Sequence, residues 1–185
     1  MSHTSRIICG FILVAALAGV AQAGITSWNP YWDASTALDP TYSGWQWSSP
    51  TTWDVWESYV GSTPTGITVG CDGSADADPT IHISKTVTNG STFDWTSYQI
   101  VISGSAGVGY VPGSATSDKF SGIGAVGNTI TYSAPLTVLQ GQAVTFGFDI
   151  TIPAGLFSFD IQQTPTPEPV SLLMFGLGAL FLRRR

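Results

Sequence analysis

The chain has 185 residues, of which 43% are apolar and only 10% are charged, and its formal net charge is −6. The basic residues lie mainly at the two ends, which leaves Lys85 and Lys119 in the interior. Nucleic-acid binding needs clustered basic side chains, so this distribution excludes a nucleic-acid partner. The aromatic content of 12% argues against simple disorder.

The N-terminus has the pattern of a secretory signal peptide over residues 1–23. Arg6 precedes an apolar run over residues 7–20, and Ala21 and Ala23 form the small-x-small site at which signal peptidase cuts. We therefore expect a signal helix that is removed and a mature chain that begins after Ala23. A buried helix or a membrane anchor is the other interpretation, but the run is short for a bilayer span.

Residues 24–70 hold six of the seven tryptophans and are interrupted by prolines. We expect irregular structure and short edge strands here, folded over the main domain. Flat aromatic rings stack on sugar rings, so the segment also predicts a surface for extracellular polysaccharide. Its candidate residues are Trp45, Trp47, Trp53 and Trp56. The competing interpretation is a hydrophobic core, because aromatic side chains anchor small domains and Trp45 and Trp47 alternate as core residues of a strand do.

An acidic loop follows, with Asp72, Asp76 and Asp78 as candidate calcium ligands. Calcium takes several oxygen ligands from such loops, but the spacing differs from the helix–loop–helix calcium pattern. A solvated acidic loop is therefore the default interpretation, and no other cofactor is predicted.

The sequence shows no strong catalytic constellation. Cys71 is the one cysteine of the predicted mature chain, and it indicates a free thiol, an intermolecular bond or an inert buried thiol. His82 could serve Cys71 as a base, but it lies between Ile81 and Ile83 and points the opposite way, as a surface histidine does. Glycoside hydrolysis by two carboxylates stays open, with Glu57 as the leading acid, since spatial pairing is not visible in a sequence.

The second half of the chain alternates apolar and polar residues with the period of a β-strand. The clearest run places one apolar residue at every second position: Val144, Phe146, Phe148, Ile150 and Ile152. Similar alternation occurs over residues 81–87, 98–102, 130–132 and 157–161, with turn signals between the runs and Asn89-Gly90 as the best hairpin turn. We predict an all-β domain over residues 24–164, an antiparallel β-sandwich of the Ig-like or jelly-roll-like kind.

The C-terminus combines a proline-rich stretch with an apolar run over residues 170–182 and a basic end. As a helix this run covers about 20 Å, less than the hydrocarbon core of a bilayer, so the terminal arginines must snorkel to the interface. By the positive-inside rule, Arg183, Arg184 and Arg185 stay in the cytoplasm and the domain lies outside the membrane.

Pro167, Glu168 and Pro169, followed by this short helix and the arginine cluster, resemble the PEP-CTERM sorting signal over residues 165–185. The resemblance implies a membrane partner, exosortase, which recognises the Pro-Glu-Pro element and cuts near it. It further implies an inner-membrane intermediate that is then moved to the cell surface or extracellular matrix of an envelope-bearing bacterium. The alternative is a tail-anchored protein that is never cut.

These features predict an exported surface or matrix protein whose domain is structural or adhesive and not an enzyme. One alternative is a carbohydrate-binding module that uses the tryptophan-rich face. Another is a small hydrolase that depends on carboxylates.

Overall fold

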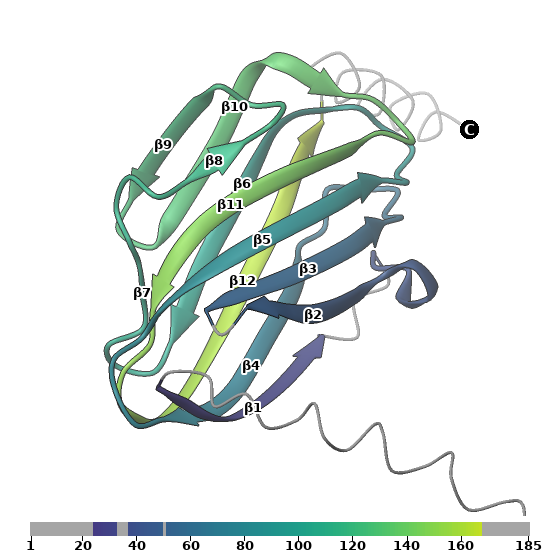
Figure 1. The fold of residues 1–185 in the computed structure, drawn as a ribbon. Helices are drawn as coiled ribbons and strands as arrows, with labels where there is room; N and C mark the ends of the chain where they lie inside the picture. Colours follow the sequence, from purple (N-terminus) through teal and green to yellow (C-terminus); the bar gives the residue numbers. More distant parts are fainter. Residues whose placement is uncertain (1–23, 33–36, 50, 168–185) are drawn as a thin grey trace, which may run out of the picture.

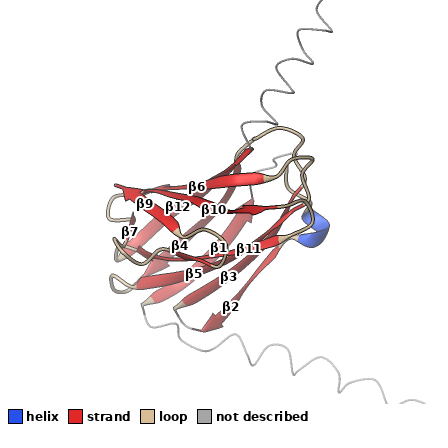
Figure 2. Ribbon diagram, turned by 90° about the horizontal axis from the view of Figure 1, so that it is seen from above, coloured by secondary structure: helices blue, strands red, loops and turns tan. Residues whose placement is uncertain are grey.

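Two β-sheets packed face to face make up the domain. The computed structural model describes residues 24–32, 37–49 and 51–167, except for the side chains of residues 134 and 135. Within these ranges the chain forms two six-stranded sheets, and Figure 2 shows them as two layers. The all-β prediction is therefore confirmed.

The first sheet, called sheet A, contains six strands. In spatial order they are β1 (Ile25–Trp32), β4 (Ile67–Ala75), β12 (Gly155–Pro167), β6 (Trp95–Gly104), β10 (Thr129–Val138) and β9 (Gly122–Val126). The second, sheet B, has the order β2 (Gly44–Ser49), β3 (Thr52–Tyr59), β5 (Thr80–Asn89), β11 (Ala143–Thr151) and β7 (Gly109–Tyr110), with β8 (Thr116–Ser117) also paired to β11. A short 3-10 helix, η1 (Pro40–Tyr42), precedes β2 (Figure 1).

The core lies between the sheets and follows the predicted alternation. The alternating apolar residues of β11 are all fully buried, as are Ile81 and Ile83 of β5. The inner faces meet through aromatic contacts: the Phe146 ring of β11 lies 4.6 Å from that of Tyr98 on β6 and 4.7 Å from that of Tyr132 on β10. Burial of one face per strand is what stabilises a sandwich.

One pair of strands departs from the predicted antiparallel arrangement. β3 and β5 run parallel, with Val55 opposite Lys85. The chain leaves sheet B after β3, forms β4 in sheet A and returns as β5. Because the chain reverses on each of these two crossings, β5 re-enters sheet B in the direction of β3.

Two local predictions need correction. The described residues of 24–70 include the edge strands β1 and β2, as expected, but β3 and β4 are regular strands inside their sheets. Asn89-Gly90 does not turn a hairpin, because β5 and β6 belong to different sheets. Instead Asn89 is buried, and its amide donates to the backbone oxygens of Phe93 and Val138. Its side chain stabilises the crossing from one sheet to the other.

The last strand reaches into the predicted sorting signal. β12 pairs with β6 as far as Pro167, opposite Trp95. The predicted signal helix and the predicted membrane helix over residues 170–182 both lie outside the described residues. Within the described ranges, the structure contains no helix with the length and hydropathy that a membrane span requires.

Candidate functional site

Two tryptophan pairs close one side of the sandwich. β1 and β2 are edge strands of different sheets, and they lie at the same side of the molecule (Figure 1). The rings of Trp28 and Trp47 lie 4.6 Å apart, and those of Trp32 and Trp45 lie 4.2 Å apart. All four rings are partly buried and pack against the core. Trp45 and Trp47 therefore join the two sheets instead of forming a free platform.

The four predicted sugar-binding tryptophans differ in burial and in the face of the sheet on which they lie. Trp53 is fully buried, and its ring lies 5.2 Å from Trp28 and 6.0 Å from Phe159. Trp56 alone lies on the outer face of sheet B, where 40% of it is exposed. The difference follows from strand period, because odd-numbered residues of β3 point inward and even-numbered ones point outward.

The Trp56 ring lies across Gly44 of the neighbouring strand. A Cβ at Gly44 would overlap the ring atoms, so only glycine leaves space for this position of the indole. On the side of β5, Trp56 is paired with Thr86. Asp54, which lies on the same outer face, is paired with Gln46 of β2. An exposed ring next to hydrogen-bonding side chains is a suitable arrangement for a sugar, with the ring below and polar groups beside it.

His82 belongs to this outer face and is paired with an acid. Its Nδ1 lies 2.6 Å from Oδ1 of Asp149, its direct neighbour on β11. Cys71 lies in sheet A, fully buried, and burial raises the pKa of its thiol to about 12. The two residues belong to different sheets and form no nucleophile–base pair. Cys71 corresponds to the inert buried thiol among the three interpretations of the sequence.

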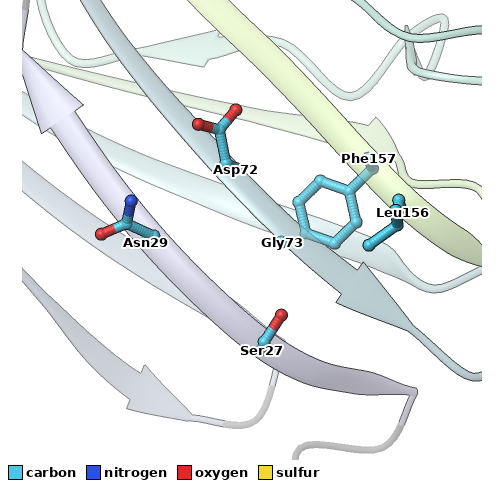
Figure 3. A pocket seen from close by; sticks show the side chains of 6 residues that line it. All are labelled: Ser27, Asn29, Asp72, Gly73, Leu156 and Phe157. Carbon is cyan, nitrogen blue, oxygen red and sulfur yellow. The ribbon is translucent and has the colours of Figure 1, made fainter.

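The three candidate calcium ligands are spread over different surroundings. Asp72 and Asn29 line an open, shallow hollow of about 400 Å³ on sheet A (Figure 3). Asp76 is exposed, and Oδ1 of Asp78 accepts a hydrogen bond from the backbone N–H of Ala154 at 2.6 Å. In the part of the chain that the structure describes, no group of three or more histidine, cysteine or acidic side chains is placed to hold a metal ion.

A tyrosine–aspartate pair lies on β1 and β12. The Tyr31 hydroxyl donates to Oδ1 of Asp160 at 2.8 Å. Partial burial, together with the bond to Asp160 and the charges of Asp160 and Asp72, raises the pKa of Tyr31 to about 12. The hydroxyl therefore remains a hydrogen-bond donor at neutral pH.

A buried polar network joins the two sheets beneath the tryptophan pairs. Lys85 of β5 places Nζ 2.5 Å from Oε1 of Glu57 on β3, and both side chains are fully buried. The Nε2 group of Gln163 on β12 donates to Oε2 of Glu57, and the Tyr98 hydroxyl donates to Oε1 of Gln163 at 2.7 Å. The Trp32 indole N–H also reaches Glu57, at 3.4 Å. Glu57, the acid considered for hydrolysis, thus has no access to an open cleft.

Lys85 and Gln163 were not identified from the sequence as partners in a buried polar network. A signal was present, because Lys85 falls in the inward phase of the run that includes Ile81, Ile83 and Val87. Gln163 continues the inward phase of Phe159 and Ile161 in the same way. A polar residue at an apolar position of a strand indicates a buried partner. The identity of that partner depends on the packing of the two sheets.

Of the predicted sorting residues, only Pro167 is among the described residues. Pro167 is buried, ends β12, and accepts a hydrogen bond from the Thr96 hydroxyl to its backbone oxygen at 3.3 Å. Glu168, Pro169, the three terminal arginines and the predicted cleavage residues Ala21 and Ala23 lie outside the described residues.

Comparison with known proteins gives no relative. Family models, curated proteins and solved structures were each searched, and none matches the chain.

Proposed function

We propose that this chain is an exported protein that exosortase sorts to the cell surface or extracellular matrix. Its mature domain acts there as a structural or adhesive β-sandwich, Ig-like or jelly-roll-like, without enzymatic activity. One observation supports this proposal most: the predicted recognition element begins where β12 ends, at Pro167. The first residue of this element, Pro167, is the last residue of the strand, so a processing enzyme would meet the rest of the element directly after β12.

Intact mass and cell fractionation test the sorting. We expect the protein from its native host to lack residues 1–23 and the apolar run over residues 170–182, and to be found outside the inner membrane. A membrane-bound protein that keeps both the run and the terminal arginines would contradict the proposal and indicate a tail-anchored protein.

A variant tests the recognition element itself. We expect Glu168→Ala to leave unprocessed precursor in the membrane, because this carboxylate is the one charge within the Pro-Glu-Pro element. Asp76→Ala is the matched control, since it removes an exposed carboxylate from a distant loop. Equal processing of both variants would refute the role of Glu168.

Carbohydrate binding is a second candidate, and the exposure of Trp56 favours it. The site is the outer face of sheet B around Trp56, Gln46 and Asp54. We expect retention on the extracellular polysaccharide of the native host, with cellulose and chitin as further probes. Trp56→Ala should abolish retention, whereas Tyr42→Ala, which removes an exposed ring from η1, should not. Equal retention of both variants would exclude this face.

A further inference from the structure

The buried network places an amine and a carboxamide on the two oxygens of one carboxylate. Glu57 contacts the amine of Lys85 through one oxygen and the amide of Gln163 through the other. Lys85 belongs to sheet B and Gln163 to sheet A. An amine, a carboxylate and a carboxamide from both layers therefore meet in a site with no exposed side chain among them.

The carboxamide is activated as an electrophile. The Tyr98 hydroxyl donates to its oxygen, so negative charge that develops there on attack is stabilised by a fixed donor. Burial and the charge of Glu57 raise the pKa of Tyr98 well above its ordinary value. The hydroxyl therefore keeps its proton at physiological pH and remains a donor.

Burial makes the proton of the Lys85 ammonium easier to remove. A buried ammonium loses several kcal/mol of hydration, and only part of that cost is returned by one partner. Burial accordingly lowers the pKa of Lys85, against the opposing effect of Glu57. A neutral lysine in a dry site is the form that attacks carbonyl carbon.

We propose that the folded chain joins Lys85 to Gln163 by an isopeptide bond, an amide between Nζ of the lysine and Cδ of the glutamine. Glu57 is the general base and acid of this single-turnover reaction. No cofactor, oxidant or second protein takes part.

The reaction exchanges one amide bond for another and releases ammonia. Glu57 accepts a proton from the Lys85 ammonium, and the neutral Nζ attacks Cδ of Gln163, forming the new C–N bond. The bond between Cδ and Nε2 then breaks, with protons passing from Nζ to Nε2 through the Glu57 carboxylate. The four remaining protons leave on this nitrogen as ammonium, and Glu57 returns to the carboxylate. Because Glu57 binds both the amine and the carboxamide, it holds them beside one carboxylate and replaces an encounter between separate molecules.

The bond would link the strand nearest the predicted surface attachment to the opposite sheet. β12 is the strand that leads to Pro167, so a pull on that end would pass covalently into β5 instead of separating the sheets. This mechanical consequence rests on the proposed function, whereas the bond itself does not.

A tryptic map of the denatured full chain tests the bond. Lys85 and Lys119 are the only lysines in the sequence, and trypsin does not cut after a lysine whose Nζ is acylated. We expect cleavage after Lys119 and none after Lys85. We also expect a branched peptide lighter than its two parts by one ammonia, with fragment ions that place the link at Gln163. Full cleavage after Lys85 would overturn the proposal, as would loss of water with the link at Glu57.

Two variants test the role of the carboxylate. Glu57→Gln keeps the shape of the side chain and removes the base, so Lys85 should become fully cleavable. Lys119→Met, the matched control, should leave the bond intact. A retained bond in Glu57→Gln would refute general-base catalysis. The wild-type map decides whether the bond exists even where a variant fails to fold, and it does so whether or not the chain is sorted.

Discussion

Tyr98 and Tyr132 are two buried tyrosines whose hydroxyl groups have different surroundings. They are opposite each other on β6 and β10, both are fully buried, and both rings contact Phe146 at nearly equal distance. They differ in their hydroxyl groups. That of Tyr98 donates to Gln163 at 2.7 Å, whereas that of Tyr132 has no hydrogen-bond partner among the described residues. Replacing each by phenylalanine keeps the ring and removes one oxygen.

The two replacements should have different effects on the free energy of unfolding. Tyr98→Phe leaves Oε1 of Gln163 buried without its donor, which costs about 1–3 kcal/mol. Tyr132→Phe removes a buried polar group that gains no hydrogen bond among the described residues, so it should be neutral or stabilising by roughly 1 kcal/mol. The acceptor oxygen of Gln163 survives isopeptide formation. Because Tyr98→Phe also removes the donor that assists that reaction, the two variants are compared once the tryptic map shows the same state of the bond in both.

Urea unfolding followed by tryptophan fluorescence measures the difference. We expect the two variants to share the slope of the wild-type protein and to differ in midpoint, with Tyr98→Phe lower. Equal midpoints would refute the assignment of the hydroxyl partners. A lower midpoint for Tyr132→Phe than for Tyr98→Phe would do the same.

The remaining predictions concern the tryptophan pair between the edge strands β1 and β2, the pH dependence of stability, and the close backbone contact at Gly73. A double-mutant cycle with Trp28→Ala and Trp47→Ala should give a coupling of about 0.5–1.5 kcal/mol in unfolding experiments, and additive losses would show that the rings do not interact. The thiol of Cys71 has an ordinary pKa of 9.0, raised to about 12 by burial, so the folded form binds the proton more tightly. Stability should therefore fall by roughly 1 kcal/mol per pH unit as pH rises through this window, and less steeply in Cys71→Ala. Gly73→Ala should destabilise the fold because its Cβ would collide with the backbone oxygen of Ser27, whereas Gly124→Ala, with open space, should not; equal thermal unfolding midpoints would contradict this.

Period-two patterns in the sequence determine most of the core. The alternating residues of β11, β5 and β12 are buried as expected, because the pleat alone decides which residues share a face. The two-residue turn at Gly127-Asn128 between β9 and β10 also follows from local chemistry, since Gly127 has a φ of +56°. The targeting signals at the two ends are likewise predictions of local sequence.

Only the tertiary structure decided which faces and strands meet. Asn89-Gly90 has the sequence of a hairpin turn, yet it carries the chain from one sheet to the other, because turn propensity is weak against the burial of two sheets. The roles of the tryptophans were open for a similar reason: a ring that stacks on sugar and a ring that fills a core have the same sequence signature. Lys85, Glu57 and Gln163 lie far apart in the chain, and their contact exists only because the inner faces of β3, β5 and β12 pack together. Side-chain phase along a strand is a local property, whereas the partner across the sandwich is set by how the whole chain folds.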